Sequence, residues 1–180
     1  MAYTFDEPKV GLLQIANTDS GVTMANGSSA IPTPPNVLGM VARAFDPTYG
    51  EGEFILLLGV ASTVVGNTVT YSPTTWQTAL SPNTANLSQP VAVAMSACTA
   101  GLFGWYQIGG LAVVKKSAVK VDPAGTRRMY QSATTGRLMQ TSAAGKNILG
   151  LASANLTTVT STTSTVVCSI NRPHFQGPIT

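Results

Sequence analysis

Few side chains in this chain have the chemistry that catalysis requires. The 180 residues include one histidine, His174, and after residue 53 the only acidic residue is Asp122. A Ser–His–Asp triad needs a carboxylate that orients its histidine, but Asp122 precedes Pro123, a pair typical of a turn. A Gly-x-Ser-x-Gly motif does not occur. We therefore expect no enzyme activity and no catalytic residues, with His174 exposed near the C-terminal end.

Two cysteines and two glutamates are the other reactive groups to consider. Cys98 and Cys168 are 70 residues apart and form no C-x-x-C motif. We expect two reduced core residues, and a disulfide between them remains open. Glu51 and Glu53 would share one face of a strand, and paired carboxylates can hydrolyse glycosides. We expect them instead to keep a loop soluble before a hydrophobic strand.

Metal and cofactor motifs are missing from the sequence. Zinc requires three or four closely spaced Cys, His or carboxylate ligands, and the calcium-loop and G-x-G-x-x-G patterns do not occur. The pair Gly145-Lys146 does not complete a phosphate-binding loop, because Asn147 follows it and Gln140 stands where the first glycine belongs. We expect neither a metal nor a cofactor.

Charge is scarce and unevenly distributed along the chain. Charged residues make up 9% of the sequence, against about 25% in an average domain. Residues 1–53 hold two basic and six acidic residues, a net charge of −4, whereas residues 54–180 hold eight basic and one acidic, a net charge of +7. The two parts could attract each other or a neighbouring copy. Nucleic-acid grooves interleave basic residues with aromatics, but only Tyr130 lies between Lys115 and Arg137, so we expect no nucleic-acid binding.

The elements that would position these groups are β-strands. Val and Thr favour strands, and turn residues recur every 8–12 positions, which is typical of a sandwich or barrel. Gly109-Gly110 predicts a hairpin or a sharp bend, and residues 65–68 predict a hairpin turn. The longest apolar stretch, 54–65, is too short and too interrupted to span a membrane. We expect an all-β protein, with strands at 37–45, 54–61, 69–71, 91–95, 103–108, 111–115, 127–130, 137–140, 148–151 and 165–170.

Residues 1–44 are expected to form an extended N-terminal arm on a β-rich body of residues 45–180. The arm contains the apolar residues Val10, Leu12, Leu13 and Ile15, which could add one strand, and the stiff pair Pro34-Pro35. Its apolar residues suggest that the arm lies on a neighbouring molecule, although a disordered terminus is the alternative. The acidic opening of residues 1–8 is unlike a secretion signal.

An aromatic cluster on one expected strand is the remaining candidate for binding. Alternation places Phe103 and Trp105 on one face of the strand and Tyr106 on the other. We expect the first two to pack in the core and Tyr106 to be available for a contact. Stacking of Trp76, Trp105 and Tyr106 on a sugar is the alternative.

Two segments of the chain resemble a viral family. The run EFILLLGVAST (53–63), followed by GNTVTY (66–71), resembles small head proteins of tailed bacteriophages. So does QPVAVAM (89–95), followed by GWYQIGGLAV (104–113). Within that group the chain is similar to capsid decoration (cement) proteins. The resemblance covers roughly residues 50–120, with a weaker match to about 152, and it leaves out the arm.

The resemblance implies a mostly β, non-enzymatic protein on the outer surface of the virion. Such a protein is made in the host cytoplasm, clamps neighbouring subunits of the major capsid protein, and is itself a homo-oligomer, with a trimer favoured. The alternatives are another phage structural component, such as a tail-tube, connector or fibre-base protein, or a carbohydrate-binding β module. The residues expected at the interface are Val10, Leu12, Leu13, Ile15, Pro34, Pro35, Tyr106, Arg127 and Arg128.

Overall fold

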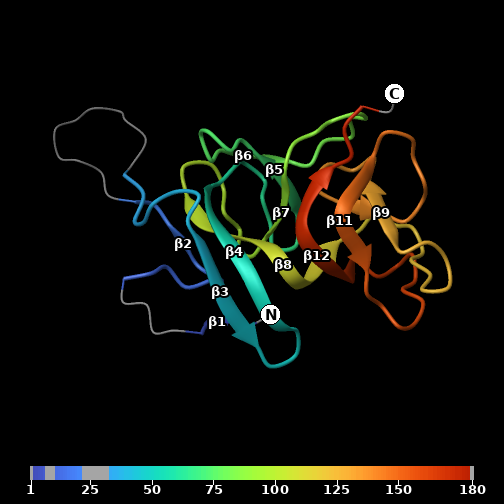
Figure 1. The fold of residues 1–180 in the computed structure, drawn as a ribbon, viewed down its shortest axis with the longest axis horizontal. Coiled ribbons are helices and arrows are strands. Elements are labelled where there is room, and N and C mark those ends of the chain that lie inside the picture. Colours follow the sequence, from blue (N-terminus) through green and yellow to red (C-terminus); the bar gives the residue numbers. More distant parts are fainter. Residues whose placement is uncertain (1, 7–10, 22–32, 179–180) are drawn as a thin grey trace.

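The computed structural model describes residues 2–6, 11–21 and 33–178, and these contain strands but no helix (Figure 1). The predicted all-β class is confirmed. Among the described residues there is accordingly no helix long and apolar enough to cross a membrane. The strands are β1 (Thr4–Phe5), β2 (Thr18–Asp19), β3 (Val41–Asp46), β4 (Gly50–Leu58), β5 (Thr68–Tyr71), β6 (Thr78–Leu80), β7 (Val91–Ala94), β8 (Phe103–Lys115), β9 (Arg128–Gln131), β10 (Leu138–Met139), β11 (Asn147–Ser153) and β12 (Thr165–Phe175).

The strands join into one antiparallel sheet with the order β1-β3-β4-β8-β12-β11-β9-β10. β7 also pairs with β8 and leads to a small branch in which β5 lies between β6 and β7. The turn at 65–68 is therefore not the hairpin turn we expected. Of the expected strand 54–61, residues 54–58 form the second half of β4, which pairs with β3 and β8, whereas β5 pairs within the branch.

β8 is the long strand that connects the two parts of the sheet (Figure 1). Its first part pairs with β4 and its second part with β12, and the change of partner falls at Gly109 and Gly110. The two glycines thus make a bend inside one strand, the second of the two predicted alternatives, and not a hairpin. Gly110 has a φ of +91°, and a Cβ built on it would overlap the carbonyl oxygen of Glu51, so only glycine fits.

Both faces of β4 over residues 54–58 and of β8 over residues 103–108 are buried, as expected for a continuous apolar run. Phe54, Leu56 and Trp105 pack on one side with Ala42 and Ala44 of β3. The alternating residues of the two strands pack on the other side against the β5–β7 branch; they are Ile55, Leu57, Tyr106 and Ile108. A third core lies between β12, β11 and β9. Each fully buried large apolar side chain contributes about 1.5–3 kcal/mol.

The described parts of residues 1–44 pack on the protein's own sheet. Tyr3 is 6% exposed and Ile15 is 2% exposed, and both belong to the core that contains Trp105. The indole Nε1 of Trp105 donates a hydrogen bond to the carbonyl oxygen of Leu13 at 2.6 Å. The boundary expected between residues 44 and 45 falls inside β3. The prediction of a separate arm was therefore wrong for these residues. They pack on the body because the apolar area that they bury there offsets the entropy lost when they become ordered.

The strand expected over 10–15 is absent from its described part, and the nearby strand is β2 at Thr18–Asp19. Leu12 and Leu13 are half-buried against the same core as Ile15, so the chain's own fold uses these anchors. Val10 lies outside the described residues.

Asp46 fixes the start of the chain and the β3–β4 turn. Its Oδ2 accepts a hydrogen bond from the backbone N–H of Ala2 at 2.6 Å, and its Oδ1 accepts from Thr48 and Tyr49 at 2.8 and 3.1 Å. Burial acts to raise the pKa of this carboxyl, but the three N–H groups outweigh burial and hold the pKa below its ordinary value.

The two cysteines are free and buried in different cores. The expectation of reduced core residues is confirmed. Burial raises the pKa of both thiols, that of Cys168 to about 12. Neither cysteine is a nucleophile in this state, because the reactive form is the thiolate.

Candidate functional site

One face of the sheet remains open from β3 across to β9. Directly paired residues on antiparallel strands point to the same side. The register pairs Arg43 with Glu53, Glu53 with Gly109, and Gly109 with Asn171, which forms one row across β3, β4, β8 and β12.

A second row continues the same face to the other edge. Ser169, two residues before Asn171 on β12, pairs with Ala152 of β11, and Ala152 pairs with Arg128 of β9. We call the surface made by these two rows the open face.

The open face is hollowed along its length. A cavity of about 560 Å³ and one of about 370 Å³ share Arg43, Glu51, Glu53 and Arg172 in their walls. The second of them shares Asn171 with a third, of about 420 Å³, which Arg128 and Leu149 also line. The three hollows therefore adjoin in a series that runs from β3 to β9.

A small network of ion pairs crosses this series. Arg43 lies 3.4 Å from Glu51 through Nη1 and 3.4 Å from Glu53 through Nη2, and Arg172 Nη2 lies 3.3 Å from Glu53 Oε2. Exposed ion pairs contribute only about 0–1 kcal/mol each, so the network orders the side chains more than it stabilises the fold. The pair between Arg172 and Glu53 joins the acidic segment 1–53 to the basic segment 54–180.

The backbone around Arg172 is shaped to reach Glu53. Arg172 has a φ of +42°, which is uncommon for a residue with a Cβ. The pairing of β11 with β12 is irregular here, because Leu149 pairs with His174 whereas Leu151 pairs with Ile170. The bulge in β12 thus places the guanidinium of Arg172 over β4. Nothing in the local sequence predicts this contact.

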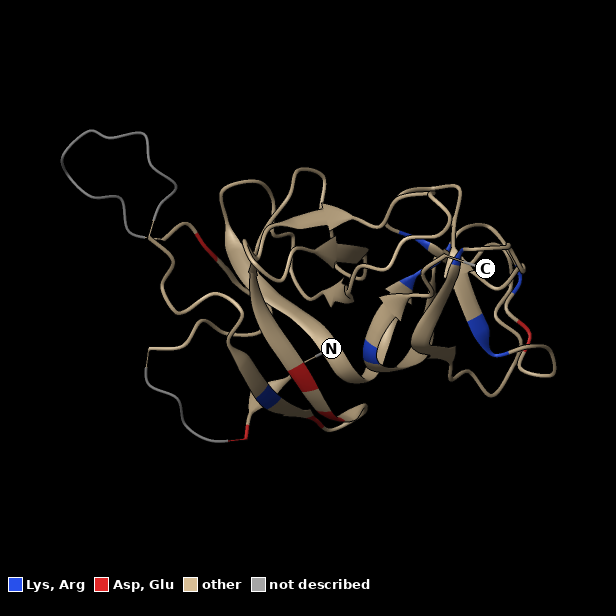
Figure 2. Cartoon of the chain, turned by 45° about the horizontal axis from the view of Figure 1, so that its top comes forward, with Lys and Arg blue, Asp and Glu red and all other residues tan. Residues whose placement is uncertain are grey.

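Acidic and basic side chains gather at opposite ends of the molecule. In Figure 2 the red residues lie mainly over β1–β4 and the blue residues mainly over β9–β12, with Arg43 and Asp122 as exceptions. The charge asymmetry of the sequence therefore becomes a separation in space.

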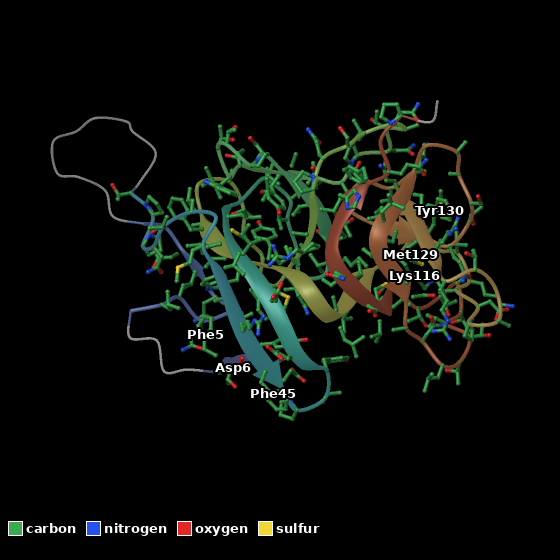
Figure 3. The ribbon with its side chains drawn as sticks, in the orientation of Figure 1. Phe5, Asp6, Phe45, Lys116, Met129 and Tyr130 are labelled. Atoms are coloured by element: carbon green, nitrogen blue, oxygen red, sulfur yellow. The ribbon has the colours of Figure 1, made fainter. Side chains whose placement is uncertain are left out.

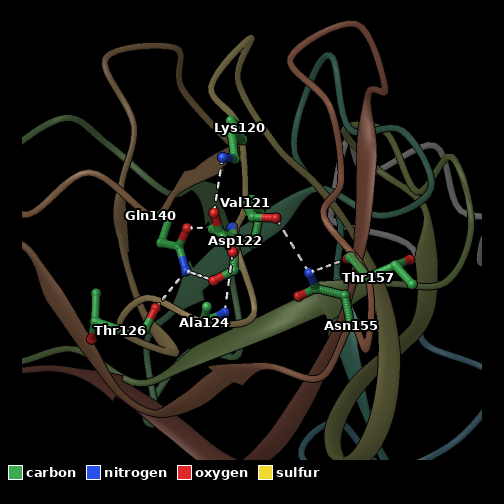
Figure 4. Close-up of polar contacts among 8 residues, drawn as sticks. All are labelled: Lys120, Val121, Asp122, Ala124, Thr126, Gln140, Asn155 and Thr157. Atoms are coloured by element: carbon green, nitrogen blue, oxygen red, sulfur yellow. Dashed lines mark hydrogen bonds and ion pairs between the residues drawn. The ribbon is translucent and has the colours of Figure 1, made fainter.

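The basic end is held in place by the amide of Gln140 (Figure 4). Gln140 Oε1 accepts from the backbone N–H of Asp122 at 2.7 Å, and its Nε2 donates to the carbonyl oxygens of Asp122 and Thr126. Lys120 pairs with Asp122 at 2.8 Å. These bonds fix the loop that leads to Arg127 and Arg128, both of which are exposed.

Lys116 is a basic residue that does not contribute to the surface. Its side chain is buried (labelled in Figure 3), and its Nζ donates to the carbonyl oxygens of Ser117 and Val119 at 3.3 and 2.9 Å. Burial lowers the pKa of this amine.

The structure corrects the expectation for Tyr106. This residue is fully buried, and its hydroxyl lies 3.5 Å from the carbonyl oxygen of Cys98. The N-terminal residues around Ile15 cover one face of this part of β8 and the β5–β7 branch covers the other, so alternation along β8 could not expose Tyr106. Phe103 and Trp105 are buried as expected. Because Trp105 and Tyr106 are both enclosed, they cannot stack on a sugar together with Trp76.

Other expected positions are only partly as predicted. His174 is exposed, but it belongs to β12 and not to a tail. Glu51 and Glu53 share a face as expected, although on β4 and not in a loop. Pro34 and Pro35 are half-buried. Four strands of the sheet separate β3 from β9, so the N-terminal residues and the two arginines do not form one site.

No chemical centre is visible in the part of the chain that the structure describes. It contains no group of three or more His, Cys, Asp or Glu side chains that could hold a metal ion. No family model, curated protein or solved structure matches the chain.

Proposed function

We propose that this chain decorates and stabilises the outer surface of a tailed-phage capsid by clamping neighbouring major capsid subunits. The observation that carries the proposal is that the carboxylates and thiols that could act in catalysis serve the fold instead. Asp46 binds backbone N–H groups, Glu53 binds two arginines, and both cysteines are buried. A structural role uses the fold itself, and the segments that resemble phage head proteins contain all or most of β4, β5, β7 and β8.

The contact with the shell is assigned to a different part of the N-terminal region from the one the sequence suggested. Ile15 is buried in the protein's own core and Leu12 and Leu13 are half-buried against it, whereas Val37 is 77% exposed just after Pro34-Pro35. An exposed valine next to stiff backbone can bury apolar area against a shell subunit with little loss of entropy. When many copies bind one shell, their weak contacts together hold the protein on the particle by avidity.

The test begins with the copy number of this chain in purified particles of its source, measured by quantitative mass spectrometry. About one copy per shell subunit, repeated over the whole surface, is the expected result. A handful of copies would assign the protein to the tail or a vertex, and complete absence would overturn the proposal.

The second part of the test is co-sedimentation of the purified chain with particles stripped of it. Val37→Asp should weaken co-sedimentation, because a buried carboxylate without a partner is costly. Val65→Asp is the matched control, since Val65 is also exposed and lies between β4 and β5. Equal binding by both variants would remove Val37 from the contact.

A further inference from the structure

We propose that the open face pairs two copies of this chain, antiparallel to each other about a two-fold axis. The inference goes beyond the proposed function, because it concerns a contact that forms without any shell. It rests on the exposed apolar side chains of the open face, on its charges, and on their arrangement relative to a two-fold axis.

Large apolar side chains are exposed at both ends of the open face. Phe45 is 49% exposed on the same side of β3 as Arg43, and it pairs with Glu51 of β4. Leu149 is 40% exposed and lines the hollow that Arg128 also lines. In Figure 3, Phe45 and Asp6 lie at one corner of the molecule and Met129 of β9 lies on the opposite side. Exposed apolar groups rimmed by charge mark interaction surfaces.

The two ends of the open face carry opposite charge. The hollow at the β3–β4 end is lined by Asp6, Glu51 and Glu53 against Arg43 and Arg172, which leaves a net charge of −1. The hollow at the other end is lined by Arg128 and, among the described residues, by no acidic side chain, which leaves a net charge of +1.

A second copy is the partner that this pattern fits. A two-fold axis that lies in the plane between the two open faces, at right angles to the line from the acidic to the basic end, places the acidic end of each copy over the basic end of the other. The same attraction then forms twice and the assembly closes. It also places Phe45 of one copy toward Leu149 of its partner. Two copies stacked in the same direction would bring like charges together, which is unfavourable. The open face is therefore complementary in charge to a second copy of itself.

The test measures the mass of the isolated full chain by sedimentation and native mass spectrometry at several salt concentrations. We expect a dimer at low salt that dissociates as salt screens the contacts. Arg128→Glu and Glu51→Lys should each weaken the dimer by about tenfold or more, because each change creates two like-charge contacts per pair. Circular dichroism verifies that both variants are folded.

Mixing the two variants is the decisive measurement. In a mixed pair the introduced lysine of one variant would face the introduced glutamate of the other at one contact, and the unchanged residues would meet at the second contact. The mixture should therefore restore the dimer mass. Arg127→Glu is the matched control, since Arg127 is the neighbouring exposed arginine and alternation directs it away from Arg128. It should leave the dimer unchanged.

Several outcomes would overturn the inference. They are a monomer under all conditions, an assembly of three copies, a dimer indifferent to both charge reversals, or a mixture that stays monomeric. The isolated chain is measured without particles, so any of these results leaves the Val37 contact and the copy number to be judged separately. Conversely, absence from particles would not affect the dimer.

Discussion

At the scale of single residues, Asp46 connects the start of the chain to the β3–β4 turn through three backbone N–H groups. Hydrogen bonds to a charged group contribute about 1.5–3 kcal/mol. We expect Asp46→Asn to lower the free energy of unfolding by about 2 kcal/mol at neutral pH, measured by urea denaturation. Asp6→Asn, which changes an exposed carboxylate, should stay within about 0.5 kcal/mol.

The pH dependence of that effect has a defined sign. The pKa of Asp46 is lower in the folded protein than its ordinary value of 3.8, so the carboxylate stabilises the fold above that pH. The stabilisation is lost as the pH falls below 3.8 and through the folded pKa. The difference between wild type and Asp46→Asn should therefore be constant near neutrality and shrink at acidic pH. A difference that persists unchanged in acid would contradict the assignment.

At the scale of elements, the bend of β8 at Gly110 decides how the two parts of the sheet join. Gly110→Ala places a Cβ against the backbone of Glu51 and Gly52 and also strains a φ of +91°. We expect a loss of about 2 kcal/mol or more, combining the backbone penalty with the overlap, seen in urea denaturation.

Gly101 provides the control for that substitution. It has a similar φ of +79°, but a Cβ there would meet nothing within 4 Å. Gly101→Ala should therefore lower the free energy of unfolding only by the cost of an alanine at positive φ, about 1–2 kcal/mol. Equal losses at both glycines would show that the close approach of β8 to β4 contributes nothing.

The strands themselves were largely predictable, whereas their partners were not. The continuous apolar run of β4 and the alternation in β8 indicate burial directly, because side chains follow the period of the strand. Tyr106 shows the limit of this argument. Alternation states which residues share a face, but only the packing of the β5–β7 branch determines that the second face is also covered.

At the scale of the whole molecule, the N-terminal residues complete a core. We expect deletion of residues 2–36 to lower the stability of the remaining chain by several kcal/mol, because it removes Tyr3 and Ile15, each worth about 1.5–3 kcal/mol. The sequence had instead suggested an arm that lies on a neighbouring molecule. Thermal unfolding followed by circular dichroism tests this, with Thr4→Ala as the control on an exposed residue of β1. An unchanged midpoint for the deletion would restore the view of a dispensable arm.

The sequence by itself determined the all-β class, the buried strands and the charge asymmetry, because these depend on composition and on local periodicity. Only the tertiary structure decided which residues form the open face. Glu53 and Arg172 are 119 residues apart, and they meet because the register across β4, β8 and β12, together with a bulge, brings them together. Long-range register depends on the packing of the whole sheet, which no local pattern specifies.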